Sequence, residues 1–160
     1  MKILLPVDGS PQALEAVRHA ASLALQGLKA SFVLVNVQEP ASLYELVVVH
    51  DGDAIERLRR AAGADLLAPA EALIDAAGLS YESEAAGGDP HQTLVELAED
   101  YGCAAIVMGA SGMGEAGADA LGSVALAVLK HSPVPVTVVR LPEPAEAAEA
   151  ADAADPAAAA

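Results

Sequence analysis

The chain has 160 residues, of which 23 are acidic and 8 are Lys or Arg, so its formal net charge is −15. Nucleic acids and anionic lipid surfaces bind basic proteins, and this charge therefore argues against both as partners. Apolar residues make up 54% of the chain, but 38 residues are Ala. No apolar run reaches the roughly 20 residues that a membrane span needs.

Residues 141–160 differ in composition from the rest of the chain. They contain five acids, three Pro and no base, and they cannot bury enough surface to offset the entropy of ordering. We therefore predict a folded domain over 1–140 and an acidic, Ala/Pro-rich disordered tail over 141–160. The N-terminal MKILLPVDGS reaches an Asp too early for a secretory signal. Because the single Cys103 cannot form an internal disulfide, we expect a cytoplasmic protein in which Cys103 is a small buried residue.

The first part of the chain predicts a strand, a helix and a second strand. Residues 2–7 (KILLPV) form a short apolar run typical of a buried strand. In the turn that follows, Ser10 is suited to cap a helix and Pro11 to occupy its first position. An apolar stripe at three- and four-residue spacing carries this helix to Gly27. Residues 31–37 (SFVLVNV) lack polar alternation, as expected for a strand covered on both faces.

The middle of the chain predicts a long helical region and an edge strand. Residues 38–53 are irregular, and LVVV at 46–49 within them is either a short strand or apolar cover for another segment. A helical stripe then runs to Gly78, and Pro69 inside it should kink or divide the helix. Residues 79–85 alternate between apolar and polar, which indicates a strand nearer the edge of the sheet.

The last part of the chain repeats the alternation of strands and helices. A helix starts at Pro90, and 103–109 (CAAIVMG) form the next strand. A glycine-rich loop leads to a short helix from Ser123 to His131, and 134–140 (VPVTVVR) form the last strand. Such alternation, with right-handed crossovers, specifies a parallel sheet. The sequence thus predicts an α/β fold, an open five-stranded parallel sheet sandwiched by four helices, with ligands at the carboxyl ends of the strands.

The loop before the last helix fits two phosphate-binding patterns only in part. Gly109 and Gly114 have the spacing of a P-loop, but Glu115 stands where that loop needs Lys. Gly112-x-Gly114-x-x-Gly117 spells a dinucleotide fingerprint, but the acid expected about 20 residues later is missing. Neither pattern accounts for the loop.

A third pattern uses the wider spacing Gly109-x2-Gly112-x9-Gly122-Ser123. Together with VDGS after the first strand and SPVPVTVV in the last strand, it resembles the universal stress protein family over essentially all of residues 1–140. The resemblance implies a Rossmann-like fold of the adenine-nucleotide alpha hydrolase type. For the ATP-binding members it also implies a nucleotide site, with or without Mg²⁺ or Mn²⁺.

In such a site, loop glycines let the backbone approach the phosphates without a Cβ in the way. The resemblance implies that Asp8 lies near adenine and ribose and that the backbone of Val37 reads the adenine edge. It also implies that Gly122 and Ser123 present hydrogen-bond donors at a helix N-terminus. The implied binding residues are Pro6, Asp8, Val37, Met108, Gly109, Ser111, Gly112, Met113, Gly114, Gly122, Ser123 and Val124.

Two features oppose nucleotide binding. Glu115 and Asp119 lie between Gly112 and Gly122, where members of the family often carry Lys or Arg. Two acids weaken the binding of a triphosphate unless a divalent cation neutralises them or their side chains face outward. In addition, Asp8 could serve only to start the turn, and the glycines only to reverse the chain. The alternative is then a homodimeric interaction module of the same fold that binds no nucleotide.

The other polar residues do not predict catalysis. No Ser, His and Asp occur at the spacing of an acyl-transfer triad. The four histidines are expected to be structural or solvated, with a weak metal site in one loop as the alternative for His50: His19, His50, His91 and His131. Enzymes of the wider adenine-nucleotide group carry an SGGxDS-type loop, which VDGSPQ replaces here. We therefore predict no enzyme, although slow ATP hydrolysis stays open.

The leading prediction is a small cytoplasmic ATP-binding regulator of the stress-response type. It should have no nucleic-acid or membrane partner, and the sequence does not identify a protein partner. In this family the last strand lies at the sheet edge and pairs antiparallel with its copy. Residues 134–140 are apolar at nearly every position, and an uncovered strand of this kind invites pairing. We expect a homodimer through this strand.

Overall fold

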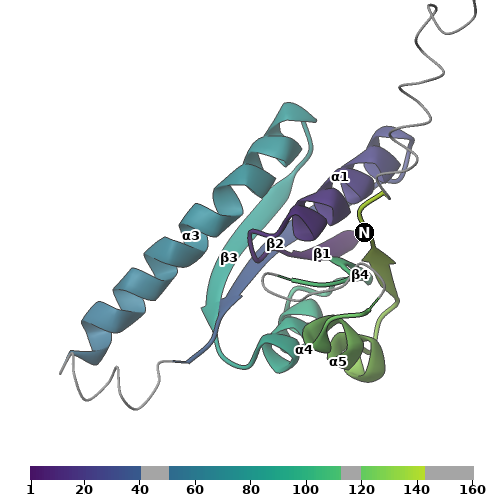
Figure 1. Ribbon diagram of the computed structural model, residues 1–160. Coiled ribbons are helices and arrows are strands. Elements are labelled where there is room, and N and C mark those ends of the chain that lie inside the picture. Colours follow the sequence, from purple (N-terminus) through teal and green to yellow (C-terminus); the bar gives the residue numbers. More distant parts are fainter. Residues whose placement is uncertain (41–50, 113–119, 143–160) are drawn as a thin grey trace, which may run out of the picture.

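The computed structural model describes residues 1–40, 51–112 and 120–142 (Figure 1). The undecided segment 46–49 lies outside them. Among the described residues, no helix is long and apolar enough to cross a membrane. In chain order, the elements are β1 (Lys2–Pro6), α1 (Pro11–Leu25), β2 (Ser31–Gln38), α3 (Gly52–Ala76), β3 (Tyr81–Gly87), α4 (Pro90–Asp100), β4 (Ala105–Gly109), α5 (Ser123–His131) and β5 (Val136–Val139).

The five strands form one sheet in the order β3-β2-β1-β4-β5, and every neighbouring pair is parallel. The chain adds β2 and β3 on one side of β1 and then crosses back to add β4 and β5 on the other side. Helices α1 and α3 cover one face, and α4 and α5 cover the other (Figure 1). The predicted fold class, an open five-stranded parallel sheet sandwiched by four helices, is confirmed.

Each face of the sheet buries its own core. On β2, Phe32 and Leu34 pack against α1 and α3, whereas Val33 and Val35 belong to the core under α4 and α5. All four side chains are at most 1% exposed. This burial on both faces explains why the strand lacks the alternation of a half-exposed strand.

Side chains cap three of the helices in the described part of the chain. Ser10, Asp51 and Asp89 each accept a hydrogen bond from the amide three residues later, at the starts of α1, α3 and α4. These bonds satisfy donors that have no partner within a helix. Gly122 precedes α5, and no side-chain hydrogen bond caps that helix. The start of α5 therefore differs from the other three.

Of the two outcomes predicted for Pro69, a kink or a division of the helix, division is wrong, because α3 runs as one helix of 25 residues. The proline removes the amide that would bond to the Asp65 carbonyl, but both residues are exposed, so water can satisfy that carbonyl. Cys103 precedes β4 instead of opening it, and its amide donates to the Ala98 carbonyl at 2.8 Å. It is buried as predicted, at 6% exposure, and this burial raises the pKa of its thiol.

Candidate functional site

A cavity of about 260 Å³ opens at the carboxyl ends of β1 and β4. The chain leaves β1 toward β2 on one side, whereas β4 pairs with β1 on the other. The cavity therefore lies where the strand order reverses, which is where open α/β sheets bind their ligands. Its walls come from the strand ends, the loop after β4 and the starts of α1, α4 and α5.

Most of the implied binding residues meet at this cavity. Nine of the twelve line it: Pro6, Asp8, Val37, Met108, Gly109, Ser111, Gly112, Gly122 and Val124. Ser123 begins α5 but is not among the lining residues, and Met113 and Gly114 lie outside the described residues. The lining residues that sequence reasoning missed are Val7, Ser10, Ala13, Val35, Glu39, Pro90, Leu94 and Ala125. Most of these are apolar and converge only through folding, so no motif marks them.

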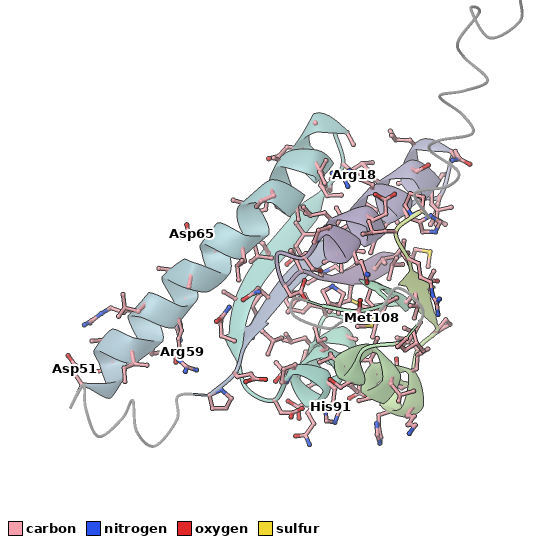
Figure 2. The ribbon with its side chains drawn as sticks, in the orientation of Figure 1. Arg18, Asp51, Arg59, Asp65, His91 and Met108 are labelled. Carbon is pink, nitrogen blue, oxygen red and sulfur yellow. The ribbon has the colours of Figure 1, made fainter. Side chains whose placement is uncertain are left out.

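The inner wall of the cavity is apolar. Val35 from β2, Met108 from β4 and Leu94 from α4 line it, and each is at most 5% exposed. Figure 2 labels Met108 between the sheet and α5. A wall of this kind accommodates the faces of a flat ring and offers them no polar partner.

Asp8 joins the start of α1 to the loop after β4. Its Oδ1 accepts a hydrogen bond from the Ser10 amide at 2.9 Å, and Ser10 in turn caps α1. Asp8 therefore does start the turn. On its other side, a Cβ built on Gly112 would collide with Asp8 Oδ2. The absence of a side chain at Gly112 thus lets the loop pass directly beside this carboxylate.

Gly109 packs closely against the start of α1. A Cβ at Gly109 would lie 2.9 Å from the carbonyl carbon of Gln12 and 3.0 Å from the amide nitrogen of Ala13. The residue lines the cavity, but its lack of a side chain first serves the close approach of β4 to α1. Gly109 thus serves this packing and also lines the cavity, and its expected place beside the phosphates stays a prediction.

Gln12 is a site residue that sequence reasoning missed. Its Oε1 accepts hydrogen bonds from the Ser111 amide at 2.7 Å and the Ser111 hydroxyl at 2.6 Å. The two residues are 99 positions apart, so no local signal could have paired them. Through this contact α1 holds the first turn of the glycine loop.

The end of β2 turns one peptide group toward the cavity. The ladder between β1 and β2 reaches the bond from the Val7 amide to the Val35 carbonyl, at 2.8 Å. In a parallel ladder the next amide facing β1 belongs to Val37, and its regular acceptor is the Val7 carbonyl. That carbonyl accepts a 2.7 Å bond from Nδ2 of the buried Asn36 side chain. The Asn36 side chain thus takes the place of a ladder bond, and Val37 lines the cavity.

The start of α5 forms the opposite end of the cavity. Gly122, Val124 and Ala125 line it there. Amide groups in the first turn of a helix carry partial positive charge and bind anions. The Gly122 amide donates to the Ala110 carbonyl at 2.8 Å and so fixes the start of the helix against the end of β4. This end of the cavity is therefore suited to an anionic group.

The charged side chains in the described lining are Asp8 and Glu39, and both are acidic. Lys, Arg and His are absent from the lining residues that the structure describes. Glu115 and Asp119 lie outside the described residues. An anionic ligand would therefore depend on helix amides or on a bound cation for its neutralisation.

Comparisons with known proteins agree with this arrangement. The profile of the Universal stress protein family matches residues 1–140. A universal stress protein of Methanocaldococcus jannaschii is 31% identical over 142 residues, which cover 89% of this chain and 83% of that protein. The structure of a protein from the universal stress protein family from Burkholderia pseudomallei has a TM-score of 0.67 at 25% identity, over 88% of this chain and 96% of its own.

A further solved structure shares the fold at lower identity. The universal stress protein from Archaeoglobus fulgidus, in complex with dAMP, has a TM-score of 0.62 at 21% identity, over 88% of this chain and 98% of its own. The matched segment 1–140 includes all nine described strands and helices. The chain belongs to the universal stress protein family.

Proposed function

We propose that this protein is a small cytoplasmic regulator that binds an adenine nucleotide, ATP above all, at the carboxyl ends of β1 and β4. One observation carries the proposal: the cavity changes character along its length. It has a strand-end peptide group at Val37, apolar walls in the middle and a helix N-terminus at the far end. A nucleotide has the same order, from the polar edge of the base through the base faces to the phosphates.

The base end favours adenine over guanine. Adenine presents an amino donor beside a ring-nitrogen acceptor, and a strand-end carbonyl and amide complement that pair. Guanine presents a carbonyl and an N–H at the same edge and reverses the pattern. Because the Asn36 side chain donates to the Val7 carbonyl, that carbonyl does not draw the Val37 amide into the ladder, and we propose that this amide meets the base. Preorganised backbone groups of this kind select a ligand by the geometry of its hydrogen bonds.

The phosphate end requires a cation for a triphosphate. Backbone groups at the start of α5 and at Gly112, which lies directly beside Asp8, are available to contact phosphates. The described lining adds no basic side chain. Mg²⁺ binds through one or two carboxylates together with substrate phosphates, and Mn²⁺ takes similar oxygen ligands. Asp8 is the carboxylate placed to share such an ion. We therefore propose that ATP binds as its Mg²⁺ or Mn²⁺ complex.

A structural relative supports an adenine nucleotide. The Archaeoglobus fulgidus protein was determined in complex with dAMP. At 21% identity this likeness establishes the fold only, so the assignment to this chain rests on its own cavity.

We propose that the bound ATP is held and not turned over. Hydrolysis needs a group that orients the attacking water in line with the leaving phosphate. Of the two carboxylates in the described lining, Asp8 accepts from the Ser10 amide and is the one proposed to share the cation, and Glu39 is exposed beyond the end of β2. A nucleotide that is held intact suits a regulator whose state follows the nucleotide supply.

We propose a homodimer through β5, which is an edge strand of the sheet. Beside it, Leu126 and Leu129 of α5 are 43% and 40% exposed. An edge strand flanked by apolar side chains is covered when it pairs with a second copy about a two-fold axis. This surface also favours the alternative function, an interaction module of the same fold that acts by dimerisation without nucleotide.

Light scattering tests the dimer. The expected mass is twice the 16.0 kDa of one chain, and Val138→Lys should shift the protein toward monomer because it places like charges near the two-fold axis. A wild-type mass of one chain would refute the dimer.

Calorimetry with Mg-ATP and Mg-GTP tests nucleotide binding. We expect saturable binding of ATP and weaker binding of GTP. Gly122→Val places a branched side chain at the start of α5, where the φ of −64° suits any residue, so ATP binding should be lost while the fold persists. Gly52→Val is the matched control, because a Cβ at Gly52 meets nothing within 4 Å. Neither heat nor a thermal shift with millimolar Mg-ATP would overturn the proposal.

A further inference from the structure

Two histidines meet outside the cavity, where α4 packs against α5. His91 lies in the first turn of α4 and His131 is the last residue of α5. The centres of their imidazole rings are 5.7 Å apart, and the ring planes are inclined by 38°. Figure 2 shows His91 at the outer side of the molecule, on α4 beside α5. Its side chain is 29% exposed and His131 is exposed, so solutes reach the pair.

Each of the two rings has its Nδ1 atom engaged by an oxygen. His91 Nδ1 lies 2.7 Å from Asp89 Oδ1, and His131 Nδ1 lies 2.8 Å from the Ala127 carbonyl oxygen. A carbonyl and an ionised carboxylate can only accept, so both Nδ1 atoms carry the hydrogen. In the neutral ring, Nε2 then holds the lone pair.

This arrangement is typical of histidines that bind transition metals. Such histidines donate their second N–H to a carboxylate or a backbone carbonyl, which fixes the tautomer and the orientation of the ring. With Zn–N bonds of about 2.0–2.1 Å, two imidazoles on one tetrahedral ion have ring centres roughly 5 to 6 Å apart. The observed 5.7 Å between His91 and His131 lies within that range.

We infer that His91 and His131 form a two-histidine site for a divalent transition-metal ion such as Zn²⁺, with Asp89 and Ala127 as its outer partners. Imidazole suits Zn²⁺, Cu²⁺ and Ni²⁺. Groups of three or more His, Cys, Asp or Glu placed to hold a metal are absent from the described residues, so water completes the coordination. Lys130 precedes His131 and is exposed, and the net charge of −15 favours a cation.

The ion would join the two helices that cover one face of the sheet. The start of α5 lines the cavity, and its last residue would be tied to the first turn of α4, beside Pro90, which also lines the cavity. The inference does not depend on nucleotide binding, because none of its ligands lines the cavity.

Zinc titration of the full chain, freed of metal by a chelator, tests the site. We expect one saturable binding event by calorimetry. At a free Zn²⁺ concentration ten times the Kd, Tm should rise by about 4–6 °C. His91→Gln and His131→Gln should each lower the Zn²⁺ affinity at least about tenfold and reduce this shift, at the same Zn²⁺ concentration, to about 2 °C or less. Their Tm without Zn²⁺ shows whether each variant is folded.

The matched controls remove the other imidazoles. His19→Gln, on the exposed face of α1, and His50→Gln should bind Zn²⁺ as the wild type does. Wild-type affinity in either His91→Gln or His131→Gln would overturn the inference. A loss of Zn²⁺ binding in His50→Gln, or after removal of the acidic residues 143–160, would also overturn it. The same holds if the wild-type chain shows neither heat nor a thermal shift with Zn²⁺.

Discussion

The two ends of the parallel sheet are held together by different kinds of contact. At and near the amino end, side chains of β3 bind other side chains, from β1 and from the end of α4. Lys2 Nζ lies 2.7 Å from Glu82 Oε1, and the Tyr101 hydroxyl donates to Glu84 Oε2 at 2.6 Å. Lys2 and Glu82 are 38% and 55% exposed, so water competes for this pair and it contributes little stability.

At the carboxyl end, side chains bind backbone groups of other segments. Asp8, Gln12 and Asn36 each bond to a backbone amide or carbonyl, and the last two reach another element. Gly109 and Gly112 bring their segments into direct contact with α1 and with Asp8. We therefore expect replacement of a side chain at the amino end to change the stability of the fold little. At the carboxyl end, a replacement moves the peptide groups that shape the cavity.

The largest effect on stability is expected at Gly109. A methyl group there would lie within 3.0 Å of backbone atoms of Gln12 and Ala13, which cannot yield unless α1 moves. We expect Gly109→Ala to lower the free energy of unfolding by about 3 kcal/mol and Tm by about 10 °C.

Gly112→Ala is the matched control for Gly109→Ala. Within the described part of the chain, its methyl group would meet the Asp8 carboxylate, which is the end of a side chain and not backbone. The free energy of unfolding should fall by less than about 1 kcal/mol, while nucleotide binding weakens. Equal losses of Tm in the two variants would contradict the distinction between a glycine needed for packing and a glycine needed at the site.

A smaller effect is expected from Asn36→Leu, which keeps the branching and number of side-chain heavy atoms but removes the bond to the Val7 carbonyl. A buried carbonyl without a partner costs about 1–3 kcal/mol, so we expect a loss of about 2 kcal/mol in denaturant unfolding. Discrimination between ATP and GTP should also fall, because the Val37 amide is then the nearest donor to the freed Val7 carbonyl and is drawn away from the adenine edge. In Gln38→Leu the bond to Asn36 Oδ1 is lost but the Val7 bond stays. If Asn36→Leu lost no more stability and no more discrimination between ATP and GTP than Gln38→Leu does, the proposed role of Asn36 would be refuted.

The Tyr101–Glu84 pair should give a modest effect that depends on pH. The hydrogen bond from the phenol to Glu84, followed by desolvation, raises the pKa of Tyr101 from 10.0 to about 12. Folding therefore favours the protonated phenol, and its contribution is complete below the unfolded pKa of 10.0 and is lost as pH rises through about 12. Tyr101→Phe should lower Tm by about 2 °C at pH 7 and flatten the decline in alkali. An unchanged alkaline decline would contradict this account.

The smallest effect is expected from truncation after Leu141. The residues removed contain no branched apolar side chain, and we expect Tm to stay within about 2 °C of the full chain. A larger loss by calorimetry would show that the tail contributes to the stability of the domain.

The sequence predicted what depends on local pattern. The strands and helices and their parallel arrangement follow from periodicity, whereas the placing of Asp8 and the glycine loop at one site was implied by the resemblance to the family. It did not predict the Gln12–Ser111 contact, because the two segments become neighbours only when β4 pairs with β1. The last strand is shorter than the predicted 134–140 because Pro135 has no amide to donate to a ladder.

The order of the strands also has a consequence during synthesis. β1, β2 and β3 come from the first 87 residues and can assemble before β4 and β5 leave the ribosome. The later half joins through the pairing of β1 with β4, and the cavity opens at the carboxyl end of that seam. A molecule seated there touches both halves of the chain. By mass action it stabilises only chains in which both halves have folded, so occupancy of the cavity reports the completion of folding.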